Sequence, residues 1–331
     1  MATMREVAAH AGVSPKTVSR VLNDDPHVLP ATRAHVEQSM RELDYVPNAM
    51  ATTFRSGRSP VVGVAVPDLV DPFFAAIVNA VEERALAEDL STLVTSLGHD
   101  PAREQPVLES MLRRQLSGLV VAPTTNDHAY LEAWSARIPI AFVDRAPGSL
   151  TADAFTQDDR GGAREATAHL IEHGHRRIGF LGDALSAPTI AERLEGYREA
   201  LAAARLPYDP ALVALGATTR PGAASALVRL RGPDAGATAV FSSDARCTMA
   251  VVPAVTAHPI ALTAFGDFPL ADTLTPSITV MAQDPAALGH LAAARLFERA
   301  AHPQRSLPRR TVLPVALIER DSCRIPAPHP A

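Results

Sequence analysis

Two cationic side chains near the N-terminus have the spacing that a DNA-reading helix needs. Lys16 and Arg20 are four residues apart, about one helical turn, so a helix would place both on one face. Each can donate hydrogen bonds to O6 and N7 of guanine in the major groove. Ser14, Thr17 and Ser19 lie beside them and carry hydroxyl groups that suit phosphate oxygens. A solvated helix with two surface cations is the alternative interpretation.

Two short helices joined by a tight turn are expected to position these side chains. Thr3 and Glu6 have capping-box spacing at the start of the first helix. Gly12 ends that helix, because the sharp turn requires a left-handed residue. Ser14 then caps the second helix, and Pro15 occupies its first position, where a missing N–H costs nothing.

The remaining chain changes from helices alone to alternating strands and helices. A third helix is expected after Pro30 and before Pro47. Predicted strands are Val61–Val66, Ser91–Thr95, Gly118–Ala122, Ile140–Val143, Arg177–Leu181, Ala239–Phe241, Ile260–Phe265 and Thr311–Leu317. Predicted helices between them include Phe74–Glu88, Gly161–His173, Ala191–Ala204 and Pro285–Arg299. So many units exceed one sheet, and two α/β lobes are therefore expected.

Composition and charge narrow the class of protein. The net charge of −5 over 331 residues argues against a protein that coats nucleic acid over its whole surface. Cys247 and Cys323 lie far apart without metal-ligand spacing, and we expect two idle thiols in a reducing compartment. The N-terminus lacks a secretory pattern, and no run approaches the ~18 apolar residues of a membrane span. We expect a cytoplasmic protein without membrane contact.

Two further groups of polar residues could form chemical sites. His169, Glu172 and His173 have a helical spacing that could suit a metal. They fall at a predicted helix end, where histidine favours the helix dipole, so no metal site is expected. Asp158 and Asp159 are interpreted as a turn between lobes rather than an acid/base pair. Phosphate-cradling glycine loops, nucleophile elbows and zinc-protease motifs are missing from the sequence, so neither an enzyme nor a cofactor is expected.

The order of the N-terminal residues is more specific than their spacing. Residues 7–23, VAAHAGVSPKTVSRVLN, resemble the headpiece of the lactose/galactose-repressor family. The resemblance continues in YVPNA at 45–49, DPFF at 71–74 and HLIEHGHRRI at 169–178, and it spans about Thr3 to Cys323. It implies an all-α helix-turn-helix headpiece and an α/β core of two similar parallel-sheet lobes, like periplasmic sugar-binding proteins. It also implies a sequence-specific DNA-binding transcriptional regulator, with repression expected.

The resemblance also implies a domain order. The headpiece is expected at 1–46, the hinge at 47–59, the core at 60–323 and a loose tail at 324–331. The first lobe should comprise about 60–157 and 284–309, and the second about 158–283 and 310–323. A homodimer on a pseudo-palindromic operator is expected, because the tail offers no heptad-patterned helix for a tetramer.

The implied DNA contacts come from the headpiece and the hinge. They are Thr3, Ser14, Pro15, Lys16, Thr17, Ser19, Arg20, Asn23, Ala51 and Phe54. The family's hinge becomes helical only on DNA and pushes an apolar side chain into the minor groove. Small Ala51 would let two hinge helices approach closely. Phe54 stands where the family usually has leucine, and its packing against the core is the alternative.

An effector cleft between the lobes is implied as well, with a sugar or sugar derivative as the expected ligand. Its implied residues are Phe73, Phe74, Asp144, Arg193, Ser243, Asp244, Asp267 and Gln283. Phe74 could equally belong to the core. Gly266 stands where the family usually has an effector-binding acid, so either Asp267 substitutes for it or the effector differs in size or chemistry. An architectural DNA-binding regulator without effector is the alternative function.

Overall fold

The computed structural model describes residues 2–22, 24–45 and 60–326. The chain forms two compact units that divide between Ser59 and Pro60. Asn23, Ala51 and Phe54 lie outside the described residues, as does the whole 47–59 hinge segment, so their roles on DNA stay predictions. Within the described residues, no helix combines the length and apolar character that crossing a membrane requires.

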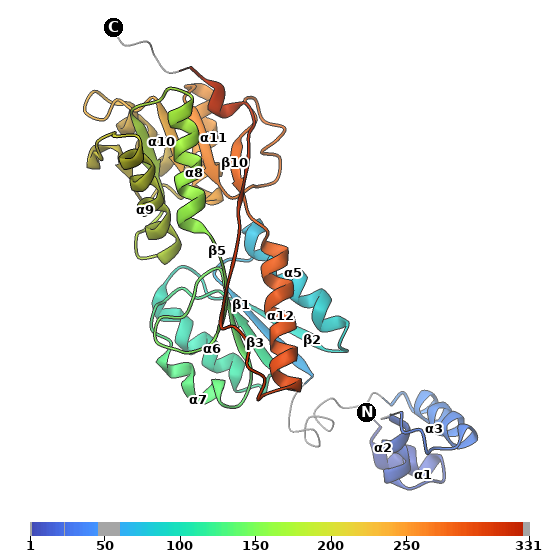
Figure 1. Cartoon of the computed structure of the whole chain (residues 1–331). Coiled ribbons are helices and arrows are strands. Elements are labelled where there is room, and N and C mark those ends of the chain that lie inside the picture. The colour runs from blue at the N-terminus through green and yellow to red at the C-terminus, as the bar shows by residue number, and fades with distance from the viewer. Residues whose placement is uncertain (1, 23, 46–59, 327–331) are drawn as a thin grey trace. The chain divides into compact units, whose positions relative to one another are not determined.

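The N-terminal unit is a three-helix headpiece (Figure 1). Its helices are α1 (Met4–His10), α2 (Pro15–Leu22) and α3 (Pro30–Glu42). The predicted capping box is present, since the Thr3 hydroxyl accepts from the Glu6 N–H and the Glu6 carboxylate accepts from the Thr3 N–H. Val7, Val18 and Val36, one from each helix, are fully buried together. The predicted helices are confirmed, and this small core holds α2 against its neighbours.

The first lobe of the C-terminal unit is a six-stranded parallel sheet between two layers of helices. Its strands are β1 (Val61–Val66), β2 (Ser91–Ser96), β3 (Gly118–Val121), β4 (Ile140–Val143), β5 (Asp153–Gln157) and β11 (Arg310–Leu313), in the order β11-β5-β4-β3-β1-β2. Its helices are α5 (Pro72–Leu86), α6 (Glu104–Leu112), α7 (Glu132–Ser135) and α12 (Pro285–Ala301). Along β1, Val64 and Val66 pack toward α5 and α12, whereas Ala65 packs toward α6.

The second lobe repeats this architecture (Figure 1). Its strands are β6 (Ile178–Leu181), β7 (Val213–Ala214), β8 (Ala239–Ser242), β9 (Ala261–Phe265), β10 (Thr279–Ala282) and β12 (Ala316–Ile318), in the order β12-β10-β9-β8-β6-β7. Its helices are α8 (Asp159–Glu172), α9 (Pro188–Ala203), α10 (Arg220–Arg231) and α11 (Ala245–Ala257). All neighbouring strands in it are parallel except β10 and β12. The predicted fold class is confirmed.

Two boundaries differ from the sequence predictions. The predicted strand Thr311–Leu317 is two strands, because β11 pairs with β5 of the first lobe and β12 pairs with β10 of the second. Pro314 lies between them and has no N–H to continue a ladder. Residues 310–313 therefore belong to the first lobe. The start of the predicted loose tail is ordered, since Arg324 lies in a 3₁₀ turn and the Ile325 carbonyl accepts a hydrogen bond from His175.

Candidate nucleic-acid interface and ligand cavity

Helix α2 turns one face to the headpiece core and the other to solvent. Val18 and Val21 are buried. Ser14, Pro15 and Lys16 are exposed, and Thr17, Ser19 and Arg20 are half-buried. The Ser14 hydroxyl accepts a hydrogen bond from the Thr17 N–H at 3.2 Å, so Ser14 is the expected cap. The predicted DNA-contacting side chains of α2 thus come together on its solvent side.

Arg20 is held in place by Asp25, a partner that the sequence did not predict. Its Nε donates to Oδ2 of Asp25 at 2.7 Å. The hydrogen bond from Arg20 lowers the pKa of Asp25 most, and two smaller contributions come from hydrogen bonds with the backbone and side chain of His27. Together they hold this pKa well below its usual range. The pairing uses the Nε side of the guanidinium, and the terminal Nη groups can make a bidentate contact to a guanine. Asp25 follows the helix in sequence, but nothing in the pattern marked it as the partner of Arg20.

The core contains a cavity of about 280 Å³ between its lobes. Residues that follow the carboxyl ends of β1, β2, β3 and β4 line it from one lobe, and residues that follow β6, β8 and β10 line it from the other. Open α/β sheets bind ligands at this edge. Six of the eight predicted effector residues line the cavity, namely Phe73, Phe74, Asp144, Arg193, Asp244 and Gln283. Phe74 also packs in the core of the first lobe, and its contact with an effector stays a prediction.

Arg193 is buried and engaged on three sides. Its guanidinium donates to Oδ1 of Asp159, at 2.7 Å from Nε, and to the carbonyl of Ser243 at 2.6 Å. It also lies 3.8 Å from the centroid of the Phe265 ring. Ser243 does not line the cavity and holds Arg193 through its backbone. Arg193 is therefore fixed in place before any ligand arrives.

The acidic pair at 158–159 has two different roles. Asp158 caps α8, accepting from the Gly161 N–H at 2.8 Å, as the turn interpretation expected. Asp159 instead pairs with Arg193. Burial raises the pKa of Asp159 to about 6, although the Arg193 charge opposes that shift. The contact joins residues that are 34 positions apart, so local sequence could not reveal it.

Asp144 lines the cavity in an unusual backbone conformation. Its φ is +66° and its side chain is buried. Non-glycine residues with positive φ are uncommon and cluster at functional sites, although aspartate tolerates the conformation better than most. Nε of Arg145 lies 3.3 Å from Oδ2 of Asp144, and Arg145 also donates to the Pro123 carbonyl at 2.9 Å. The end of β4 thus presents a carboxylate and a guanidinium group next to each other.

The backbone conformation at residue 266 explains why glycine stands there. Gly266 has φ +86°, and a Cβ there would lie 2.9 Å from Oε1 of Gln283. Asp267 does not line the main cavity. Its carboxylate accepts two hydrogen bonds from Arg320, at 3.0 and 2.7 Å, beside a separate shallow depression. The structure therefore does not place Asp267 where it could replace the missing acid.

Several charged residues of the cavity were not predicted. They are Asp71, His99, Arg145, Asp183 and Arg246. Arg246, from the second lobe, donates to Nε2 of His99, from the first lobe, at 2.9 Å, and it also donates to Asp183. Burial raises the pKa of Asp71. Asp71, His99 and Asp183 each follow the carboxyl end of a strand, and that position in the sequence could have indicated that they line the cavity.

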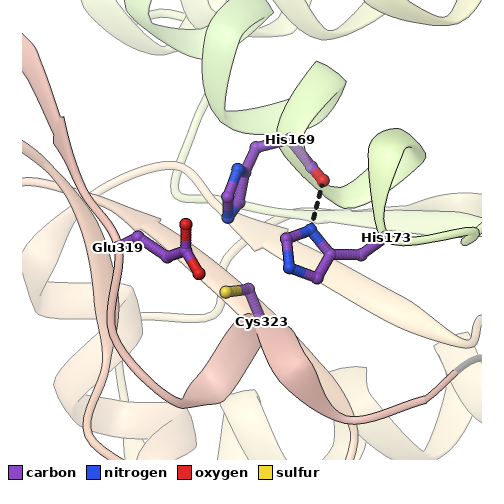
Figure 2. A group of neighbouring side chains, drawn as sticks. All are labelled: His169, His173, Glu319 and Cys323. Atoms are coloured by element: carbon purple, nitrogen blue, oxygen red, sulfur yellow. Dashed lines mark hydrogen bonds between the residues drawn. The ribbon is translucent and has the colours of Figure 1, made fainter.

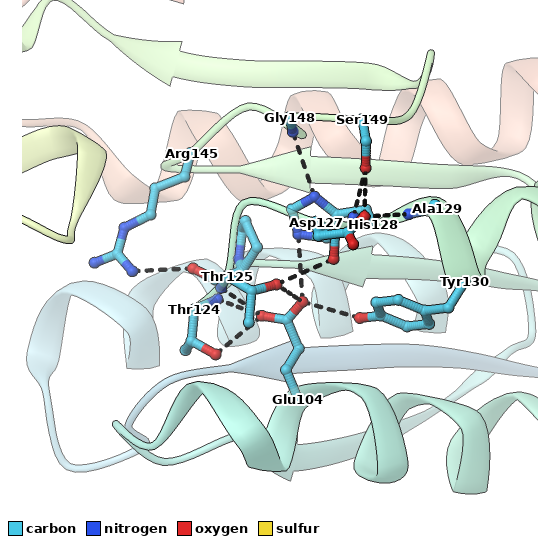
Figure 3. A network of polar contacts seen from close by, with 11 residues as sticks. Glu104, Thr124, Thr125, Asp127, His128, Ala129, Tyr130, Arg145, Gly148 and Ser149 are labelled. Atoms are coloured by element: carbon cyan, nitrogen blue, oxygen red, sulfur yellow. Dashed lines mark hydrogen bonds and ion pairs between the residues drawn. The ribbon is translucent and has the colours of Figure 1, made fainter.

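A buried acid braces one wall of the cavity (Figure 3). Glu104, at the start of α6, accepts hydrogen bonds from the N–H and hydroxyl groups of Thr124 and Thr125, and from the Tyr130 hydroxyl at 2.9 Å. Burial alone would raise its pKa, but these bonds and the His128 ring, whose Nε2 lies 3.3 Å from Oε1, outweigh burial and lower the pKa to about 2. Thr124 lines the cavity, so Glu104 holds the loop after β3 against it.

Both the headpiece and the core of the chain match known protein families. Residues 3–48 match the family described as bacterial regulatory proteins, lacI family, and residues 167–323 match a periplasmic binding protein-like domain. The transcriptional regulator GalR of Salmonella typhimurium strain SL1344 is 36% identical over 241 residues, which cover 72% of this chain and 70% of GalR.

Solved structures extend the likeness to nearly the whole fold. A complex of the transcriptional regulator CelR with cellobiose is 28% identical, has a TM-score of 0.70, and covers 97% of this chain and 100% of the other. A lac repressor dimer bound to operator and an anti-inducer is 24% identical, with a TM-score of 0.85, covering 97% and 99%. The latter likeness concerns the fold.

Proposed function

The chain belongs to the lacI family of bacterial regulatory proteins and is a DNA-binding transcriptional regulator; from this premise we propose that a small polar metabolite in the interlobe cavity controls its operator affinity. One observation carries the proposal. The cavity is lined by carboxylates and guanidinium groups from both lobes, so a single ligand can contact both lobes at once. A ligand that binds one lobe arrangement better than another shifts the DNA-binding equilibrium by that difference.

The lining favours a hydroxyl-rich ligand. Four carboxylates can accept hydrogen bonds from hydroxyl groups, namely Asp71, Asp144, Asp183 and Asp244, and three arginines can donate to ring or carboxylate oxygens, namely Arg145, Arg193 and Arg246. The half-buried ring of Phe73 offers a flat apolar surface. A volume of about 280 Å³ lies at the small end of ligand pockets. We infer a sugar or sugar derivative, and the structure of CelR with cellobiose supports that class.

Repression through a symmetric operator completes the proposal. One headpiece carries one recognition helix, and half-sites on a palindrome need two copies of it. The operator-bound lac repressor dimer, which shares this fold, supports a homodimer. We place the protein in the cytoplasm, where a bacterial regulator meets its DNA.

The test begins with the DNA that the purified protein retains, which identifies the operator by sequencing. Operator affinity is then measured by fluorescence anisotropy with a panel of sugars, sugar acids and sugar phosphates. We expect at least one to change the affinity and to raise the melting temperature. If no compound does either, the effector-independent architectural regulator becomes the better interpretation.

A variant ties the response to the cavity. Arg193→Lys keeps a cation beside Asp159 but loses the planar fork, so it should keep the fold and operator binding while weakening the effector response. Arg229→Lys on α10, away from the cavity lining, is the matched control and should respond normally.

A further inference from the structure

Four side chains with metal-binding atoms meet at one end of the second lobe. His169 lies in the last turn of α8 and His173 directly follows that helix. Glu319 follows β12, and Cys323 lies in the 3₁₀ turn Ser322–Arg324. One ligand atom from each lies within 4.8 Å of every other. Figure 2 shows the two imidazoles facing the carboxylate and the thiol across a common space. None of these residues lines the interlobe cavity.

The imidazole of His169 points to a missing ligand. His169 is 7% exposed, and its Nε2 has no hydrogen-bond partner within the part of the chain that the structure describes. A buried polar atom without a partner costs free energy, because it gives up water and gains nothing in return. Figure 2 shows this ring directed toward Glu319 and Cys323. A cation bound there would supply the partner.

The second imidazole is already oriented as a ligand. Nδ1 of His173 lies 2.9 Å from the carbonyl oxygen of His169, and since a carbonyl can only accept, Nδ1 carries the proton. Nε2 of the neutral ring then presents its lone pair on the opposite side. Metal-binding histidines are commonly fixed by such a hydrogen bond from the other nitrogen.

We propose that His169, His173, Glu319 and Cys323 bind a divalent transition metal, with Zn²⁺ as the best fit. Two imidazoles, a thiolate and a carboxylate are the donors that Zn²⁺ takes in tetrahedral protein sites. Tetrahedral Zn²⁺ holds its donors about 3.4 Å apart, so ligand atoms that now lie within 4.8 Å of one another must move closer together on binding. Arg324 donates to Oε1 of Glu319, and the carboxylate has a second oxygen to offer.

The sequence alone predicts no metal here, because the two histidines fall at a helix end, where they favour the helix dipole. Glu172, the acid next to them in sequence, is not part of the cluster. The two missing donors come from the end of the core, which the second sheet brings back beside α8. With four protein ligands the site is closed and structural. It fastens the C-terminal segment to α8, independently of whether the cavity binds a sugar.

The test uses the untagged full chain after treatment with a chelator. Titration with Co²⁺ alone should give one equivalent of tetrahedral Co²⁺ with a sulfur-to-metal charge-transfer band, and Zn²⁺ should displace it. His173→Gln and Cys323→Ala should each weaken Zn²⁺ binding about tenfold or more and the latter should abolish the thiolate band. Cys247→Ala, which changes the other buried thiol of the same lobe, should keep both.

Stability gives a second measurement on the same proteins. Zn²⁺ should raise the melting temperature of the chain and of Cys247→Ala, but not that of the site variants. Glu319→Gln alters an exposed side chain, so it tests the site even if a buried variant folds poorly. Metal binding that is unchanged in both Cys323→Ala and Glu319→Gln, or a chain that binds no stoichiometric Co²⁺ or Zn²⁺, would overturn the proposal.

Discussion

Arg20 and Lys16 differ in how the headpiece constrains them. Asp25 anchors Arg20 through Nε, whereas Lys16 is exposed on the same side of α2. An anchored guanidinium loses less conformational freedom when it contacts a base. We therefore expect two contributions of Arg20 to sequence selection: its charge, and the fixed orientation that Asp25 gives to its guanidinium group.

We predict that Arg20→Ala and Lys16→Ala each weaken operator binding about tenfold while affecting random DNA much less. Asp25→Ala should weaken operator binding to a smaller extent, because it removes the anchor and not the donor. Anisotropy titrations on operator and on scrambled duplex measure both. Equal losses on the two duplexes would reduce these side chains to phosphate contacts.

Asp159 provides a pH dependence with a defined sign. Its pKa rises from 3.8 to about 6 on folding, so the folded chain binds a proton in that interval and the unfolded chain does not. Stability from this group therefore increases as pH falls from about 6 toward 3.8. The same proton weakens the ion pair with Arg193.

We predict that the unfolding free energy of the wild type, relative to Asp159→Asn, increases as pH falls across this interval. Chemical denaturation at a series of pH values measures the difference, and the asparagine variant subtracts all other titrating groups. A flat difference would show that Asp159 is ionised throughout and that its pairing with Arg193 outweighs burial.

Helix α6 illustrates how one element supports a wall of the cavity. It places Glu104 beneath the loop after β3, where one carboxylate satisfies two backbone N–H groups at once. An amide cannot accept as many hydrogen bonds, and its NH₂ group would face donors. The loop is therefore coupled to this single side chain.

We predict that Glu104→Gln destabilises the fold by about 2 kcal/mol or more, because buried donors lose their acceptor. Glu109→Gln on the same helix, which removes a surface ion pair with Arg113, should change stability by about 0.5 kcal/mol or less. The pKa of Glu104 is lowered from 4.5 to about 2. Its contribution is thus complete above 4.5 and is lost as pH falls toward 2, which an acid-unfolding profile of the two variants would reveal.

Across the core as a whole, the lobes touch at the edge of the cavity. Arg246 of the second lobe donates to His99 of the first, and Gln283 donates to Gln157 beside the crossover. Contacts of this kind favour one arrangement of the lobes over others. Any effector has to act on that balance.

We predict that Arg246→Ala shifts the lobes toward a more open arrangement. An exposed polar contact contributes about 1 kcal/mol or less, so effector affinity should fall by about fivefold or less. Small-angle scattering with and without effector measures the opening, and calorimetry measures the affinity. His99→Ala should reproduce the effect, and if it does not, Arg246 acts on the ligand directly.

Features that depend on neighbours along the chain could be predicted from the residues alone. The capping box of Thr3 and Glu6, the glycine turn at Gly12 and the strand Val61–Val66 follow from local hydrogen bonding and side-chain periodicity. The resemblance implied Phe73 and Asp144 as cavity residues, and both follow the strand ends that line the cavity. The resemblance added the DNA-binding role, which the comparisons bear out.

The pairing of groups that are distant in sequence depends on the tertiary fold. The pairs Asp159–Arg193 and His99–Arg246, and the meeting of His169 with Cys323, join segments that no periodicity relates. The short strand Asp153–Gln157 escaped prediction because it carries few apolar residues and is defined by its neighbours in the sheet. Local sequence specifies backbone conformation, but the identity of a buried charge's partner depends on how the sheets bring remote segments together.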